Sequence, residues 1–319
     1  MATTNTLLDA ARGGDHDAYR ALIEPHRAEL HAHCYRMLGS IHDAEDALQE
    51  TLLRAWRGLR GFEGRSSTRA WLYKIATNTA LRQIERRPRP AEPLDTAAEI
   101  DPYPDAQVPA GLAAPDARYE QRESIELAFV AAVQHLPARQ RAALILREVL
   151  GFSAREVADA LETTVPSVNS ALQRARRTLD ERLPARSQQA TLRALGDERT
   201  AAIVERYVDA LERADLDAVL ALLTEDAVWS MPPDPKSYAG PEAIAGFLRE
   251  GPFHVRWRHR AARASGQLAI GCYAWDADRR AYRALVLDVL TLRDDRIAAV
   301  TSFIDGELFA RFGLPAQLP

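Results

Sequence analysis

Residues 151–179 read GFSAREVADALETTVPSVNSALQRARRTL, and they decide how the middle of the chain folds. Ser153 stands three residues before Glu156, which is the spacing of a capping box, so a short helix is expected to begin just after Ser153. Thr164 can cap a second, longer helix, in whose first turn Pro166 needs no hydrogen-bond donor. A short helix, a tight turn and a longer helix together predict a helix-turn-helix.

The longer helix of this motif has two chemically different faces. Its apolar residues recur at helical spacing and should face inward: Val168, Ala171, Leu172, Ala175 and Leu179. The outer face carries polar residues first and arginines after them, which suits base-edge and then phosphate contacts in a major groove: Ser167, Asn169, Ser170, Arg174 and Arg177. The alternative is a bundle helix whose basic C-terminus suits its dipole.

The turn between the two helices departs from a common pattern. It carries Glu162 where many helix-turn-helix motifs have glycine. A carboxylate is unfavourable near DNA phosphates, so the sequence alone offers no reason for this residue.

Residues 42–59, HDAEDALQETLLRAWRGL, predict an amphipathic helix with an unusual outer face. An exposed leucine stands there among acidic and amide groups: Asp46, Gln49, Glu50 and Leu53. Such a face fits a partner with basic and apolar contacts. A solvated face with one stray leucine is the other interpretation, because folded surfaces are largely apolar.

Residues 68–87, TRAWLYKIATNTALRQIERR, predict a further helix whose outer stripe combines Trp71, Lys74, Asn78 and Arg82. A ring, two cations and an amide are the groups that bind single-stranded nucleic acid by stacking, phosphate contact and base-edge contact. The preceding loop GFEGRSST brings Arg65 close to the same stripe. The alternative is that Trp71 belongs to the core and the cations are solvated.

The composition of the whole chain is that of an ordinary cytoplasmic protein. It has 319 residues, a net charge of −4 and two widely separated cysteines, which form neither a disulfide framework nor a metal knuckle. No apolar run reaches the roughly eighteen residues of a membrane span. We therefore expect a cytoplasmic chain without metal or cofactor.

Composition also divides the chain into parts. Residues 88–118 are rich in proline and alanine and have no periodicity, which is typical of a linker. It separates residues 1–87 from residues 119–184, both with helical periodicity. Residues 197–319 combine two helical patterns with five strand-like runs and predict an α+β domain containing an antiparallel meander.

In combination, the segments at 43–56, 62–87 and 136–179 resemble the extracytoplasmic-function (ECF) sigma factors of bacterial RNA polymerase over residues 8–184. The resemblance implies two all-α sigma domains. It assigns core-polymerase contacts to Asp46, Gln49, Glu50 and Leu53, −10 recognition to the stripe that includes Trp71, Lys74 and Asn78, and −35 recognition to the outer face of the helix-turn-helix. An extended linker of this length spans about 100 Å, more than the roughly 70 Å of two DNA turns.

Residues 197–319 resemble SnoaL-like domains of the NTF2 fold, which form a cone with a pocket. The resemblance places polar and aromatic residues near that pocket: Trp229, Tyr238, Trp257, His259 and Asp288. Asp288 lies in phase with apolar residues of its strand, where an unpaired carboxylate would be costly. It can serve as a general base, but pairing with Arg283, His259 or another neighbour on the outer face of the sheet is the favoured expectation.

The expected function is therefore a transcription initiation factor, not an enzyme, that binds core RNA polymerase and promoter DNA. The C-terminal domain is expected to regulate it by docking on the sigma domains or the linker, with an unknown small molecule as a further candidate partner. Two alternatives stay open: a stand-alone DNA-binding regulator that uses the helix-turn-helix alone, and a SnoaL-type pocket enzyme.

Overall fold

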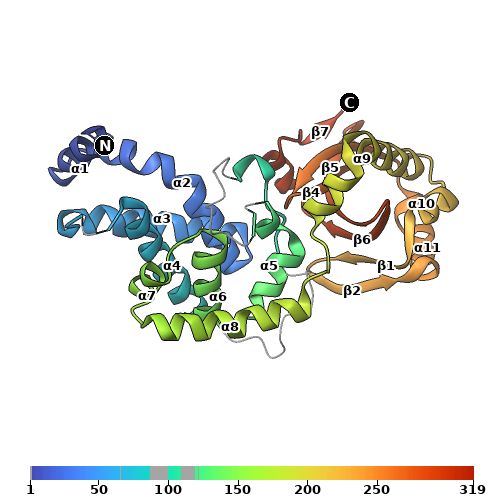
Figure 1. The fold of residues 1–319 in the computed structure, drawn as a ribbon. Coiled ribbons are helices and arrows are strands. Elements are labelled where there is room, and N and C mark those ends of the chain that lie inside the picture. The colour runs from blue at the N-terminus through green and yellow to red at the C-terminus, as the bar shows by residue number, and fades with distance from the viewer. Residues whose placement is uncertain (1, 65, 87–99, 109–118, 121) are drawn as a thin grey trace. The chain divides into compact units, whose positions relative to one another are not determined.

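A computed structural model describes residues 2–64, 66–86, 100–108, 119–120 and 122–319 (Figure 1). The chain forms two compact units, and each is described by itself. The first consists of Met1–Asp95 and Gln107–Leu183, and the second of Thr96–Ala106 and Pro184–Pro319. Part of the expected linker therefore belongs to the C-terminal unit.

The first half of unit one is a helical bundle. Its elements are α1 (Ala2–Arg12), α2 (His16–Leu38), α3 (Ile41–Gly58), the 3-10 turn η1 (Leu59–Gly61) and α4 (Thr68–Arg86). Ser40 caps α3 by accepting a hydrogen bond from the Asp43 amide. The inner stripe of this amphipathic helix includes Ala44, Ala47 and Ala55, which are fully buried. Burying this stripe leaves the opposite face of α3 to solvent.

The second half of unit one contains the helix-turn-helix. Its elements are η4 (Glu123–Ile125), α5 (Leu127–Gln134), α6 (Ala138–Leu144), the π-helical η5 (Ile145–Val149), α7 (Ala154–Ala160) and α8 (Val165–Arg182). The predicted capping box of Ser153 and Glu156 is present at the start of α7. Thr164 caps α8 by accepting a hydrogen bond from the Ser167 amide. The local start signals in the sequence were therefore sufficient to predict this motif.

Buried polar contacts join the two halves of unit one. The fully buried Arg36 at the end of α2 donates from Nε to Ser124 Oγ at 2.9 Å. Gln134 of α5 donates to the Arg36 carbonyl at 3.1 Å. The Arg69 guanidinium of α4 lies 4.8 Å from the centre of the Phe152 ring. Because buried polar groups are costly without partners, these contacts fix the two halves against each other in this conformation.

Unit two is built on one twisted sheet. Its strands are β1 (Leu223–Met231), β2 (Asp234–Ala239), β3 (Trp257–Ala264), β4 (Gln267–Asp276), β5 (Ala281–Arg293), β6 (Arg296–Phe303) and β7 (Gln317–Leu318). The order is β2-β1-β6-β5-β4-β3, with β7 on β5. Strands β3 to β6 form the predicted antiparallel meander, and β1 joins β6 in parallel.

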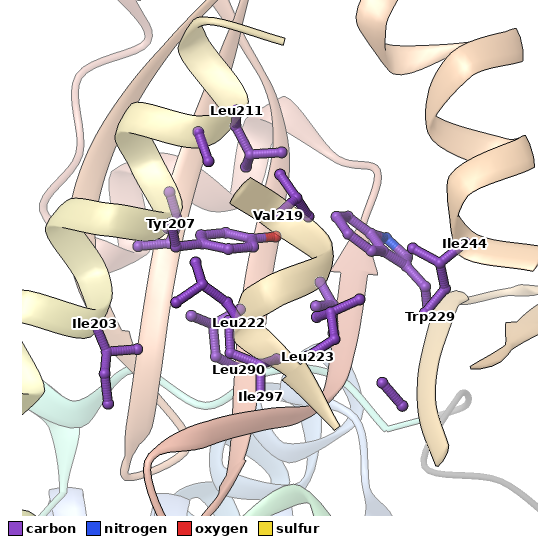
Figure 2. Packing of buried hydrophobic residues seen from close by; sticks show 14 of the residues in the cluster. Ile203, Tyr207, Leu211, Val219, Leu222, Leu223, Trp229, Ile244, Leu290 and Ile297 are labelled. Carbon is purple, nitrogen blue, oxygen red and sulfur yellow. The ribbon is translucent and has the colours of Figure 1, made fainter. Parts of the chain in front are cut away.

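Helices cover the sheet and enclose the core of unit two. They are α9 (Gln188–Glu212), broken at Gly196, then α10 (Leu216–Leu222) and α11 (Gly240–Glu250), with 3-10 turns η6 (Pro252–His254) and η7 (Gly306–Phe312). Figure 2 shows the buried cluster, in which Tyr207 of α9 lies near Val219 of α10 and Trp229 of β1. The result is the expected α+β architecture; β2, β7 and α11 had not been anticipated.

A piece of the expected linker is bound to the β3–β4 turn of unit two. Tyr103 is fully buried, its carbonyl accepts from the Ser265 amide at 2.7 Å, and its own amide donates to Ser265 Oγ at 2.9 Å. Asp105, at the start of η3 (Asp105–Gln107), accepts from the Gly266 amide at 2.7 Å. The middle of the linker is thus held by the C-terminal unit, which its lack of periodicity did not predict.

Candidate nucleic-acid interface and ligand cavity

The outer face of α8 is open to solvent. Val168, Leu172 and Leu179 are buried, and this places the predicted −35 residues outside: Ser167, Asn169, Ser170, Arg174 and Arg177. Arg177 forms an exposed ion pair with Glu181 at 3.2 Å. The face presents short polar side chains near its N-terminal end and arginines behind them, which is the order that a major-groove helix requires.

Arg176 differs from its neighbours on α8. Its Nε donates to Glu148 Oε1 at 2.7 Å, and the Glu148 side chain is only 3% exposed. Hydrogen bonding to this carboxylate raises the pKa of Arg176. Arg176 therefore neutralises a buried acid of η5 and holds α8 in place, a role distinct from that of Arg174.

The outer stripe of α4 is half-buried because the helix-turn-helix packs on it. Lys74 Nζ lies 3.2 Å from Glu162 Oε1, and Asn78 Nδ2 donates to the Ala160 carbonyl at 3.4 Å. The Trp71 ring packs on Phe62 at 4.8 Å between centres. Arg82 is exposed, and Arg65 lies outside the described residues. The structure thus brings two of the candidate −10 residues, Lys74 and Asn78, against the candidate −35 motif.

A crevice of about 640 Å³ lies between α4, the loop before it and α7. Trp71 and Lys74 form part of its wall. Four acidic residues line it as well: Glu63, Glu156, Asp159 and Glu162. Among the described residues of this wall, one lysine stands against four carboxylates, a balance that is unfavourable for a phosphate backbone in this conformation.

The geometry at the turn explains Glu162. Its φ of 52° lies in the left-handed region that favours glycine. This backbone conformation explains why many helix-turn-helix motifs have glycine at the position. Glu162 adopts that conformation at some cost, and its side chain pairs with Lys74. The carboxylate that is unfavourable beside DNA is therefore bound to a lysine from the other half of the unit.

The candidate polymerase-binding face lies on α3, opposite its buried stripe. Asp46 and Gln49 are exposed, and Leu53, a large apolar residue, is 52% exposed. Glu50 Oε1 accepts from Arg54 Nε at 2.6 Å, which orients its carboxylate. The face combines negative charge with an accessible leucine.

Unit two contains a cavity of about 370 Å³. Trp229, Trp257, His259 and Asp288 line it, whereas Tyr238 is not among the lining residues and stacks on Phe247 at 4.4 Å between ring centres. His259 Nδ1 lies 3.5 Å from Glu212 Oε1. Burial lowers the pKa of His259, although Glu212 opposes the shift. Most of the remaining wall is apolar.

Asp288 is buried at this cavity and is bound by neutral groups. Ser302 Oγ donates to it at 2.6 Å, Tyr207 OH at 3.1 Å, and Cys272 Sγ at 3.6 Å. Burial raises the pKa of Asp288 to about 6, against these hydrogen bonds. The expected pairing with Arg283 or His259 is wrong.

The reason for this correction is that each expected partner lies beside another acid. Arg283 lies 3.8 Å from Asp276, and His259, although it lines the same cavity, lies near Glu212. The Asp288 side chain is on the cavity side of β5, where Ser302 is its cross-strand partner on β6. The sequence did not predict the three hydrogen-bond partners of Asp288, which are Tyr207, Cys272 and Ser302. Only Ser302 could have been found, by counting residues along the β5–β6 hairpin.

The described part of the chain contains no cluster of three or more histidine, cysteine or acidic side chains suited to a metal ion. Among the same residues, no helix is long and apolar enough to cross a membrane.

Comparison with known proteins places three families along the chain. The family model Sigma-70 region 2 matches residues 22–89, Sigma-70 region 4 matches residues 126–179, and the SnoaL-like domain matches residues 204–300. ECF RNA polymerase sigma factor SigG from Mycobacterium tuberculosis is 42% identical over 328 residues, covering 96% of this chain and 86% of the relative.

Two other proteins illustrate how far the likeness extends. RNA polymerase sigma-H factor from Pseudomonas aeruginosa is 30% identical over 178 residues, covering 56% of this chain and 92% of that relative. The crystal structure of the Mycobacterium tuberculosis ECF sigma factor SigJ matches with a TM-score of 0.61 at 21% identity, covering 92% of this chain and 99% of that one. This last likeness is one of fold.

Proposed function

The chain belongs to the extracytoplasmic-function (ECF) RNA polymerase sigma factors, which are transcription initiation factors, and we propose that it reads the −35 element with α8 and the −10 element with α4. The outer face of α8 carries this proposal, because its exposed polar residues precede Arg174 and Arg177. Core polymerase makes the bonds, in the cytoplasm, and the chain contributes no chemistry of its own.

The core polymerase is proposed to bind the outer face of α3. Asp46, Gln49 and Glu50 offer acceptors to basic partner residues, and Leu53 offers an apolar contact among them. An apolar partner side chain would remove the exposed Leu53 from water, while basic partner residues pair with the acidic groups around it.

The −10 element is proposed to bind Trp71, Lys74, Asn78, Arg82 and Arg65. Stacking on Trp71 and an amide contact from Asn78 suit extruded or single-stranded bases. In the described conformation Lys74 and Asn78 contact the helix-turn-helix instead. Promoter opening by this factor therefore requires α7 to move away from α4.

The C-terminal unit is proposed to regulate the factor by holding the linker. Its hydrogen bonds to Tyr103 and Asp105 support this proposal. With that point fixed, the preceding sixteen residues, 87–102, reach only about 50 Å when fully extended. Docking of the C-terminal unit on the sigma domains stays a prediction from the sequence.

Run-off transcription with core polymerase tests the sigma function. The full chain and residues 1–190 should both initiate at a cognate genomic promoter, and Asn78→Ala should initiate at least about tenfold less, because a base contact is lost. If none of the three directs initiation from any genomic promoter, the proposal fails. Binding of operator duplex without polymerase as the sole activity would favour a stand-alone regulator, and turnover by residues 197–319 would favour an enzyme.

The linker contact has its own test in the full chain. Tyr103→Ala removes a buried ring from the contact and should raise run-off transcription about threefold, since loss of buried apolar area weakens the captured state. Gln107→Ala, just beyond the hydrogen bonds, serves as the control. Equal activity of both variants and the unmodified chain would contradict regulation through the linker.

A further inference from the structure

The cavity of unit two has an apolar mouth. Three of its lining residues are large apolar side chains that stay substantially exposed: Val255 at 40%, Leu285 at 40% and Ile304 at 55%. Exposed apolar groups gathered around one opening mark a place where another apolar surface binds. The volume of about 370 Å³ lies at the lower end of the range of small-molecule pockets, roughly 300–1,000 Å³.

The inner end of this cavity carries the carboxyl group of Asp288. Its three hydrogen-bond donors, from Ser302, Tyr207 and Cys272, are all neutral. None of the described residues forms an ion pair with it. Of the two partners expected from the sequence, Arg283 lies near Asp276 and His259 lies near Glu212. A buried carboxylate without a cation is electrostatically incomplete.

The other titratable groups around Asp288 do not supply positive charge at neutral pH. Burial lowers the pKa of His259, and Glu212 beside it opposes that shift. Burial raises the pKa of both the Cys272 thiol and the Tyr207 hydroxyl, so both stay neutral. Asp288 is therefore the residue that carries charge at neutral pH among the described residues lining the cavity. Its pKa of about 6 leaves its carboxyl group mostly ionised there.

Aromatic rings complete the surroundings. Trp229, Trp257, Phe247 and Phe253 line the same space. The Trp229 indole already donates to Ser302 Oγ at 2.8 Å, and that hydroxyl donates to Asp288. Indole faces attract cations as well as apolar groups. The walls therefore suit a molecule that is apolar along most of its length and positive at one end.

We propose that this cavity binds a small apolar molecule carrying one protonated amine, whose ammonium group donates hydrogen bonds to the Asp288 carboxylate while its apolar part packs on the tryptophan-lined wall. Binding of such a ligand supplies the missing positive charge. The inference rests on the regulatory role proposed for the C-terminal unit, and for that reason binding and transcription are measured separately.

Calorimetry on the full chain at neutral pH tests the proposal with three probes of nearly equal size: naphthylmethylamine, naphthylmethanol and naphthoate. The amine should bind at least about tenfold more tightly than the alcohol, because only the amine forms a charge-assisted hydrogen bond. Naphthoate should bind weakest, because its charge repels Asp288. Equal affinities for amine and alcohol, or no binding by the amine, would overturn the proposal.

Two further measurements separate the Asp288 contact from simple apolar binding. Asp288→Asn should weaken amine binding about tenfold and change alcohol binding by less than about threefold. In the unmodified chain, amine affinity should fall as the pH drops through about 6, where Asp288 takes up a proton, while alcohol affinity stays level. The pH series needs no variant, so a variant that does not fold leaves the proposal testable.

Transcription provides the separate readout. Run-off activity of the full chain is compared with and without saturating naphthylmethylamine. Amine binding that depends on Asp288 but leaves transcription unchanged would contradict the regulatory role of the C-terminal unit and would still support the proposed binding site. Loss of selective amine binding would remove the site, whatever the transcription result.

Discussion

Helices α4 and α8 carry the same kinds of candidate DNA-binding side chain, but only α8 presents them freely. On α8, Arg174 and its polar neighbours are exposed. On α4, Lys74 and Asn78 contact the turn and first helix of the motif to which α8 belongs. One of the two proposed DNA-reading surfaces is therefore in contact with the other half of the same unit, and the −10 function proposed for α4 requires separation of α4 and α7.

The strongest test of this comparison prevents that separation. A chain with Lys74→Cys and Glu162→Cys, joined by a short bismaleimide, should lose run-off activity by more than about tenfold and keep −35 duplex binding within about twofold. The native Cys34 and Cys272 are buried and should not react. Full initiation by the cross-linked chain would show that α4 works without leaving α7.

The next test compares two arginines on α8. Arg174→Ala should weaken binding to −35 duplex about tenfold, with little change in stability. The slope of log affinity against log salt concentration should fall by roughly one, because one phosphate contact is lost. Arg176→Ala removes the hydrogen-bonded ion pair that Arg176 makes with the buried Glu148 side chain and should lower the free energy of unfolding by about 2 kcal/mol.

Gel shifts across a salt series and denaturant unfolding distinguish these two outcomes. The pair is well matched, because both residues are arginines on one helix. If Arg174→Ala proved to be the destabilising variant and Arg176→Ala the one impaired in DNA binding, the assignment of the α8 face would have to be reversed.

The smallest effect is expected at the turn. Glu162→Gly removes the ion pair with Lys74 and relieves a positive φ, so the free energy of unfolding should change by less than about 1 kcal/mol. Run-off activity should rise about twofold, because the covered state loses one contact. Glu162→Gln removes the charge alone and should show a similar rise; a fall in activity for both variants would contradict the role of this pair.

The sequence predicted what depends on local spacing. The capping box at Ser153, the cap at Thr164 and the buried stripe of α8 follow from helix periodicity and short-range hydrogen bonding. Glu162 could not be explained in that way, because its partner Lys74 lies far away in sequence. Its positive φ was not predicted either, although other turns of this kind carry glycine there, and its ion pair depends on tertiary packing.

The candidate cavity shows the same limit. Phase along β5 indicated that Asp288 would be buried, and it is. Its hydroxyl partner Tyr207 comes from a helix about eighty positions earlier, and no periodic pattern connects the two. The linker contact was also hidden, because Tyr103 binds a turn through main-chain groups that any sequence provides.

That linker contact has a consequence for concentration. Tyr103 and the Ser265 turn belong to one chain, so their association is unimolecular, with an effective concentration in the millimolar range for short flexible connections. A weak intrinsic affinity is then enough to keep the linker captured, and a modest loss of affinity releases it. The same C-terminal unit supplied as a separate polypeptide at micromolar concentration would leave most linkers free, which makes covalent fusion the property on which this mode of control depends.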